Sequence, residues 1–565
     1  MKVKLVFGLL ALAITLSGCT GIPQSSEVYY GEEITQDEST QFIRVIARPP
    51  SNGMNPEEIV RGFLDACADP SENYGIARQY LAVESAGDWN PSTGVEIYDA
   101  STIEVSGDTS DLTVVARKLG NISDLGRYQS ADSGAQVSES FELEQDLSGQ
   151  WRIVNLSDGI LLSSGDVDRS FRSFPIYFFN TELTSLITDT VMVPVSNSGA
   201  ATSLVRSLLD GPSPYLSPVA TSAFPVGTTL TYGSVPITNG IAQVDLSNEI
   251  LGADEAIRGA LSAQLVWTLN TLANVSAVQI SVSGQPLTFA NSSGPQTIQD
   301  WQNLSTLPNP ESVNLNVIRS DNVYTVQGES ESLRFVSPSP IIFTSANASG
   351  TQIATVTADR KSLLVSSASD STFALAAKGD QISKPTWDLD GNIYFSDLGQ
   401  GVREVLKDGS IRSVSVDVSN LGTNDQVKNV SVASDGVRVA VVLSDGIQDV
   451  IAVGAIFRTE NETRIIGLHR IERSITYARD IIWSSSTSIA AIGSDESKSE
   501  LLFDISLLDG KSKLFSTPVG AQQVAVDGAG KLYVSAVDGT TQLVYQQSFG
   551  SWTEVAPGIV GFFSD

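Results

Sequence analysis

The sequence predicts a multidomain protein in which two α+β domains are followed by an all-β propeller of five to seven blades. Three observations lead to this prediction. The chain has 565 residues, more than a single hydrophobic core usually serves. Helix and strand patterns alternate as far as residue 290, and beyond residue 320 apolar strands and polar turns recur at steps of roughly 31 to 51 residues. Hydrophobic residues make up 41% of the chain, which is typical of globular domains.

The N-terminal segment has the features of an export signal that ends in a lipidation site. Two lysines precede an apolar run of about twelve residues, too short for a bilayer core that needs ~20. The run closes with Leu16, Ser17, Gly18 and Cys19, the pattern of a bacterial lipobox. In that pathway the Cys19 thiol receives a diacylglycerol, the signal peptide 1–18 is removed, and the new amino terminus is N-acylated. An ordinary secretory signal with an incidental cysteine is the alternative.

Acyl chains on Cys19 would anchor the protein to a membrane. Two or three chains, at ~0.8 kcal/mol per buried methylene, hold a protein on a bilayer where one chain does not. No second apolar run is long enough to cross a membrane, so this lipid is the one anchor that the sequence predicts. We therefore expect a lipoprotein at the extracytoplasmic face of the cell membrane.

Composition excludes several functions. The formal net charge is −30, and −32 without the signal peptide, so the surface would repel nucleic acid. Once Cys19 is lipidated, Cys67 is the one remaining thiol, and its place on an apolar helix face predicts a buried structural residue. His469 is the only histidine, so a histidine-rich metal site is excluded and a catalytic triad would depend on His469 alone. We expect no cofactor, no metal and no catalytic residue.

The first domain is expected at residues 41–165, after a flexible polar tether at 19–40. A helix should begin after Asn55, because Pro56 follows at the first helical position and acids fill the first turn. A second short helix is expected at 74–81. Four alternating strand patterns follow, and two helices before an antiparallel sheet resemble the NTF2-like fold.

The second domain is expected at residues 172–290 as a compact α+β sandwich. The predicted order is two strands, a helix at 201–210, three strands, a second helix and a final strand. Asn239 and Gly240 form a strong hairpin turn, because both tolerate positive φ. Asp254 can cap the second helix, whose apolar stripe is Ile257, Leu261, Leu265, Leu269 and Leu272.

Four segments of this second domain resemble the GerMN domain of extracytoplasmic sporulation and germination lipoproteins. They are LLDGPSP at 208–214, GIAQVDLSNE at 240–249, AQLVWTLN at 263–270 and VQISVSGQPL at 278–287. These motifs are mainly structural, so the resemblance implies a fold and a compartment more than an activity. Trp267 lies outside the leucine stripe, and we expect a core aromatic, with a contact residue as the alternative.

A linker is expected at 291–320, and the propeller at 321–565. Five segments of the propeller share an apolar strand, a polar turn and a second apolar strand, beginning at Ala354, Pro385, Ser431, Asp480 and Gln523. Trp387 and Trp483 stand where other copies have valine, which predicts interior packing; a ring of sugar-binding aromatics is the alternative.

The whole mature chain resembles the actinobacterial LpqB lipoprotein family, on the ordered combination of lipobox, acidic tether, α+β domain, GerMN-like domain and degenerate propeller. This resemblance implies a non-enzymatic accessory of the MtrA–MtrB two-component system. It would bind the outer sensor domain of an MtrB-like histidine kinase and modulate signalling for cell-wall homeostasis and division. Cys19 with its lipobox neighbours is the one functional site that carries over.

Two other functions stay open from the residues alone. The domains could form a module that binds a cell-wall polymer or a small signal, with Trp387 or Trp483 in contact with it. The chain could also be a carboxylate-dependent hydrolase of wall glycans, which needs two acids roughly 5–9.5 Å apart in a cleft. Acids are abundant, but no spacing singles out a pair.

Overall fold

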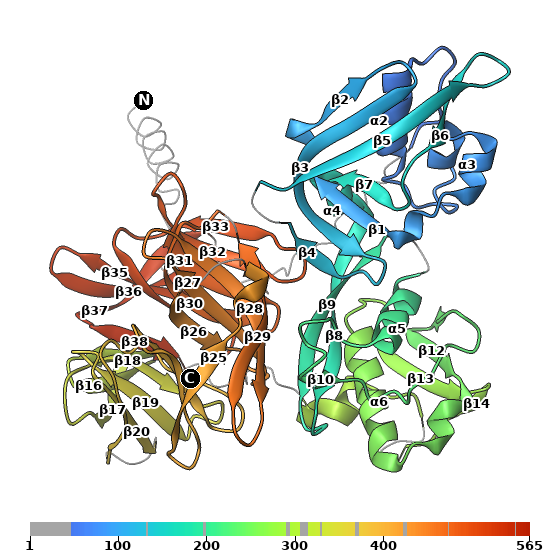
Figure 1. Cartoon of the computed structure of the whole chain (residues 1–565). Coiled ribbons are helices and arrows are strands. Elements are labelled where there is room, and N and C mark those ends of the chain that lie inside the picture. The colour runs from blue at the N-terminus through green and yellow to red at the C-terminus, as the bar shows by residue number, and fades with distance from the viewer. Residues whose placement is uncertain are drawn as a thin grey trace, which may run out of the picture. The chain divides into compact units, whose positions relative to one another are not determined.

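The computed structural model describes residues 47–564 with interruptions at 132–133, 196–198, 290–293, 305–314, 328–329, 368–371, 422–425, 473 and 549. Within these residues two mixed domains precede a large all-β domain (Figure 1). The predicted fold class is therefore confirmed. All tertiary contacts described below lie within one compact unit, residues 45–565.

The first domain is a curved sheet with short helices against it. Its sheet has the order β6-β5-β3-β1-β7, with β2 and β4 also paired to β3. The helices are α2 (Pro56–Ala66), α3 (Val83–Asp88) and α4 (Ser164–Ser170). The strands are β1 (Gly94–Tyr98), β2 (Glu104–Gly107), β3 (Asp111–Ser123), β4 (Tyr128–Ser130), β5 (Gln136–Gln145), β6 (Trp151–Asn155) and β7 (Ile160–Ser163).

Helix α2 begins where the sequence predicts, and its capping explains why. The Asn55 side chain accepts the Glu58 N–H, and the Glu58 carboxylate accepts the Asn55 N–H, a reciprocal capping box. The apolar face of the helix is buried against the sheet. The short helix expected at 74–81 is only a 3₁₀ turn, Ala77–Tyr80, and α3 follows it unpredicted.

The described residues of the second domain form two sheets and two α-helices. One sheet has the order β10-β8-β9 and the other β11-β12-β13-β14. The elements are β8 (Phe171–Asn180), β9 (Leu186–Pro194), α5 (Ala200–Asp210), β10 (Ala220–Thr221), β11 (Ile237–Thr238), β12 (Ile241–Leu246), α6 (Glu255–Leu269), β13 (Ala277–Val282) and β14 (Gln285–Pro286). Of the three strands predicted between the two helices, the first, expected at 229–232, forms only a single bridge, Leu230 to Leu246.

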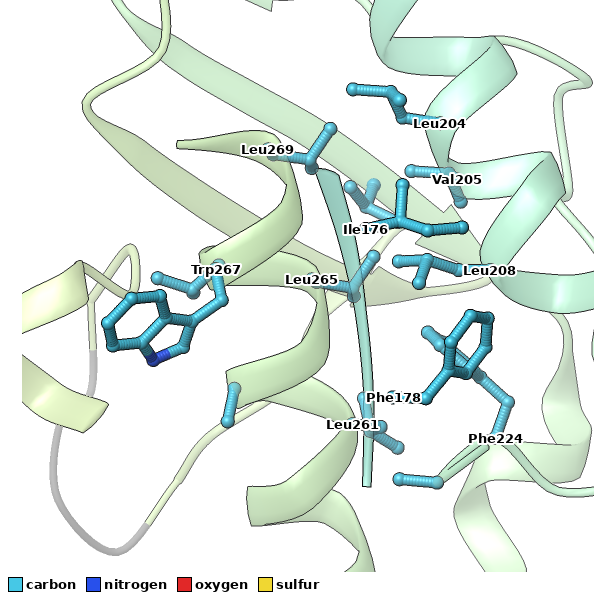
Figure 2. Packing of buried hydrophobic residues seen from close by; sticks show 14 of the residues in the cluster. Ile176, Phe178, Leu204, Val205, Leu208, Phe224, Leu261, Leu265, Trp267 and Leu269 are labelled. Atoms are coloured by element: carbon cyan, nitrogen blue, oxygen red, sulfur yellow. The ribbon is translucent and has the colours of Figure 1, made fainter. Parts of the chain in front are cut away.

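Figure 2 shows the core of this domain, where α5, α6 and strand β8 meet. Leu261, Leu265 and Leu269 point from one side of α6 toward Ile176 and α5. Trp267 points away from them, but it is 8% exposed and its Nε1 donates to the Trp301 carbonyl at 3.3 Å. The leucine stripe and the interpretation of Trp267 as a core aromatic are both confirmed.

The third domain begins earlier than predicted. Its first two sheets contain β15 (Leu315–Arg319), β16 (Asn322–Gln327), β17 (Ser330–Val336), β18 (Ile341–Ala346), β19 (Gln352–Thr357), β20 (Ser362–Ser367) and β21 (Ala374–Lys378). Strand β15 lies inside the segment that was expected to be a linker. Its residues form a strand because they pair with β16. The preceding residues 294–304 pack on the second domain, where Gln296 forms backbone hydrogen bonds with Val278.

The remaining strands complete four-stranded units of the same kind. The next units contain β22 (Thr386–Trp387), β23 (Ile393–Asp397), β24 (Gly401–Val405), β25 (Ile411–Val416), β26 (Gln426–Val432), β27 (Arg438–Ser444), β28 (Asp449–Arg458) and β29 (Thr463–Glu472). The last contain β30 (Tyr477–Ser485), β31 (Ser488–Ser494), β32 (Glu500–Ser506), β33 (Ser512–Ser516), β34 (Ala521–Val526), β35 (Leu532–Asp538), β36 (Thr541–Ser548), β37 (Ser551–Pro557) and β38 (Gly561–Ser564). The parallel pairing of β25 with β29 joins two of these units into an eight-stranded sheet.

Over the described residues 315–564 these strands form a propeller of six blades. The first blade has the order β17-β16-β15-β38, so the C-terminal strand supplies the innermost strand of the N-terminal blade. Strand β38 contacts β18 on one side and β34 on the other. The inner strands β18, β22, β26, β30 and β34 contact one another in succession, so β38 completes the ring. Six blades fall within the predicted range.

Trp387 and Trp483 hold neighbouring blades together. The Nε1 of Trp387 donates to the Ser345 carbonyl on β18, and that of Trp483 to the Ser431 carbonyl on β26, at 3.3 and 3.0 Å. Each tryptophan is 8% exposed. The predicted interior packing is confirmed. The copy that begins at Ala354 is one strand out of phase, because it pairs the second and third strands of its blade.

A buried ion pair joins the first and second domains. Arg127 Nη1 lies 3.1 Å from Asp189 Oδ2, and its Nη2 donates to the Gly211 carbonyl. The Asp189 side chain is 3% exposed and also accepts the Ser213 N–H. Since removing one partner of a buried pair leaves an uncompensated charge, this contact is expected to define the junction.

The second domain and the propeller share an apolar contact at Tyr215 and His469. Their ring centroids are 4.7 Å apart. Gly467 makes room for this contact, because a Cβ there would lie 2.8 Å from the Tyr215 Cβ. Ala455 of β28 belongs to the apolar core of the second domain. Burial lowers the pKa of His469, so its imidazole is neutral at pH 7.

We predict that Phe562→Ala destabilises the propeller, because Phe562 on β38 is 2% exposed and fills the core of the closing blade. The expected loss is about 3–5 kcal/mol, measured as a lower urea midpoint for the propeller transition. Leu514→Ala is the matched control, because Leu514 is 53% exposed on the outer strand β33. Equal midpoints for the two variants would contradict closure by β38.

We predict that His469→Gln flattens the pH dependence of stability. The pKa of His469 is lower in the folded than in the unfolded chain, so the unfolded chain binds more protons below about pH 6.5. Wild-type stability should therefore fall relative to the variant as the pH drops from 7 to 5, by at most about 2 kcal/mol. Urea unfolding at several pH values measures this, and parallel curves would contradict the prediction.

Candidate functional site

A large cavity lies at one end of the propeller channel, and we call it the funnel. It has a volume of about 980 Å³ and is lined by the inner strands β18, β26, β30 and β34 and by loops before β22 and after β19, β23 and β27. Its polar lining includes Arg360, Lys384, Lys428, Asn429, Arg479 and Gln523.

Two lysines in the funnel each form the same arrangement with a buried carboxylate. Lys428 Nζ lies 2.9 Å from Asp449 Oδ2 and donates to the Ala478 carbonyl, while the Ala478 N–H donates to the same carboxylate oxygen. Lys384 repeats this with Asp480 and Val524, at 3.2 Å from the carboxylate. Both carboxylates are less than one-tenth exposed. Each charge therefore has an opposite charge and hydrogen bonds that compensate its burial. Because the lysine, the carboxylate and the main-chain groups come from more than one blade, these pairs join different blades at the channel wall.

The other two cations of the funnel differ in their partners. Arg479 Nη2 lies 3.2 Å from Glu500, and its Nη1 donates to the Ala521 carbonyl. Arg360 forms no ion pair with any described residue; its Nε donates to the Ile382 carbonyl at 2.9 Å. Burial lowers the pKa of Arg360, and nearby Asp397 partly opposes this effect. Arg360 is thus a cation with unused donors.

Large apolar side chains are exposed at the rim of the funnel. Ile447, in the turn between β27 and β28, is 92% exposed, and Leu398, after β23, is 50% exposed. Tyr477 is 44% exposed, with Lys428 Nζ 3.9 Å from its ring centroid. These three side chains form the rim of the funnel.

The residues that the sequence analysis identified as candidates lie in different environments. Cys67 is 1% exposed, and burial raises its thiol pKa, which confirms a structural thiol. His469 packs between the second domain and the propeller with Nδ1 3.2 Å from the Gly467 carbonyl, so it is not placed as a base. Leu16, Ser17, Gly18 and Cys19 lie outside the described residues.

Carboxylate chemistry finds little support in the funnel. Asp449 and Asp480 are bound by lysines and main-chain N–H groups, as above. Asp445 accepts the N–H groups of Ile447 and Gln448, which lowers its pKa and keeps it ionised. Each of these carboxylates therefore serves the structure, whereas a general acid must hold a proton at neutral pH.

Sequence reasoning missed the funnel, although the repeat carried a signal for it. Lys384, Asp480 and Gln523 occupy one repeat position, three residues before the position of Trp387 and Trp483. Polar residues that recur there point into the channel. In the described part of the chain no helix is long and apolar enough to cross a membrane, and no group of three metal-ligating side chains occurs.

Three family models match the chain in order. Residues 49–168 match the Lipoprotein LpqB N-terminal domain, residues 175–288 match a domain described as Sporulation and spore germination, and residues 319–561 match the Lipoprotein LpqB beta-propeller domain. Together the two LpqB models span more than half of the chain.

Several similar proteins are named Lipoprotein LpqB, and the similarity extends over most of their length. Lipoprotein LpqB of Cutibacterium acnes is 26% identical over 86% of this chain and 85% of its own, and that of Thermobifida fusca is 26% identical over 86% of each. Lipoprotein LpqB of Rhodococcus opacus is 25% identical over 99% and 97%.

Among solved structures, TolB from Acinetobacter baumannii matches 46% of this chain and 66% of its own, with 15% identity and a TM-score of 0.36. The three domain matches and the full-length relatives agree in order and extent. The chain belongs to the LpqB lipoprotein family.

Proposed function

We propose that this protein is a lipid-anchored, non-enzymatic adaptor that binds the outer sensor domain of an MtrB-like histidine kinase and modulates two-component signalling for cell-wall homeostasis and division. The observation that carries the proposal is membership of the LpqB family over nearly the whole chain. The lipobox supports anchoring through Cys19, with the protein on the extracytoplasmic face.

Confinement to a membrane supports an adaptor role. A lipid anchor restricts the search for a membrane-bound partner to a thin layer, which raises the effective concentration, so modest contacts suffice. The exposed rim residues Ile447, Leu398 and Tyr477 supply an apolar contact surface on a propeller whose blades are tied together by buried pairs. We assign the kinase contact to this rim.

We predict that Cys19→Ser releases the protein from the membrane. The substitution removes the thiol that receives the diacylglycerol, and without acyl chains no other anchor is expected. Fractionation should move the variant from the membrane to the soluble fraction, and mass spectrometry should find no lipid on its N-terminal peptide. Retention of the variant in the membrane fraction would contradict the anchor.

We predict that Ile447→Asp weakens binding to the purified outer domain of the kinase by tenfold or more. A charge at an apolar contact must be desolvated without a partner, which costs about 1–3 kcal/mol or more. Val83→Asp is the matched control, because Val83 is equally exposed, at 92%, in the first domain. Biolayer interferometry measures both. No binding by the unaltered chain would contradict the adaptor, and equal binding by both variants would contradict the rim as its contact surface.

A further inference from the structure

The funnel has the size and composition of a small-molecule site. Its volume of about 980 Å³ lies in the upper range of ligand cavities, ~300–1,000 Å³. Lys384 and Lys428 form ion pairs with buried carboxylates, so a ligand must bind to funnel residues that have no such partner.

Arg360 offers the unused positive charge. Its guanidinium lies 5.6 Å from the Phe343 ring centroid, and its two Nη groups have no acceptor among the residues that the structure describes. A guanidinium with both Nη groups free matches a carboxylate or a phosphate, which accepts two parallel hydrogen bonds.

Gln523 offers a second polar group to a ligand, independently of Arg360. It is 7% exposed on β34, it lines the funnel, and its side-chain amide has no hydrogen-bond partner in the described part of the chain. The Gln523 amide is therefore available to pair with a group bound in the funnel. An amide both donates and accepts, as a sugar hydroxyl does.

We propose that the funnel binds a small sugar that carries an anionic group. The carboxylate or phosphate lies on the Arg360 guanidinium, and a ring hydroxyl pairs with the Gln523 amide. The ionised Asp445 carboxylate lies in the turn between β27 and β28. It repels an anionic group from its side of the rim and accepts a hydrogen bond from a sugar hydroxyl. This inference is independent of kinase binding.

The turn of Arg360 allows a variant that keeps the fold. Arg360 has φ +59°, a conformation that favours glycine, so Arg360→Gly removes the guanidinium and relaxes the backbone. Lys498 has φ +60° in the equivalent turn, between β31 and β32, and does not line the funnel. Lys498→Gly therefore removes one positive charge under the same backbone conditions and is the matched control.

The experiment is saturation-transfer NMR on the full chain in lipid nanodiscs, with empty nanodiscs as the blank. The probes are glucuronate, glucose 1-phosphate and glucose. We expect saturation transfer to at least one of the two anionic sugars, at least fivefold above that to glucose. The stronger of the two anions identifies the group as a carboxylate or a phosphate.

The variants decide where the sugar binds. Arg360→Gly should reduce the transfer at least fivefold, Gln523→Leu at least twofold, and Lys498→Gly should leave it unchanged. Absence of transfer to both anionic sugars would overturn the proposal. So would equal transfer to glucose, or an Arg360→Gly variant that behaves like Lys498→Gly. Since no kinase is present, the outcome is separate from that of the adaptor experiment.

Discussion

Closure of the propeller by its last strand is the constraint on which the rest of the structure depends. Val317 pairs with Phe562, so the two ends of a domain of about 250 residues meet in one blade. Without β38 the edge of β15 would be unpaired, and the ring of inner strands would be open between β18 and β34. The funnel exists because the inner strands converge, and its lining residues come from the second to the sixth blade, which surround the channel in the closed ring.

Buried charges at the channel wall add specificity to this closure. The Lys428–Asp449 and Lys384–Asp480 pairs each bind a main-chain N–H and a carbonyl of the blade that follows the one carrying the carboxylate. A buried pair of this kind contributes little net stability, but a blade shifted by one residue would leave its charges unpaired. Trp387 and Trp483 act similarly through indole hydrogen bonds to the preceding blade. The funnel therefore keeps its geometry around Arg360 and Gln523.

Prediction from the sequence succeeded where the signal was local. Helix α2 was predicted from Asn55 and Pro56, the α6 stripe from its leucines, and the propeller from a recurring strand-turn-strand pattern. It failed at the short helix 74–81, which is a 3₁₀ turn, and at the start of the propeller, where β15 begins at Leu315. Both depend on packing against distant strands, which overrides weak local preference.

The sequence by itself determined the order of the domains, the lipobox motif at Cys19 and the scarcity of catalytic groups, because these are properties of neighbouring residues or of composition. Only the tertiary structure decided the number of blades, the contact of Tyr215 with His469, and the convergence on one funnel of Arg360 and Gln523. The reason is physical: those features join residues more than 150 positions apart, whose proximity arises when the ring closes and the domains pack together.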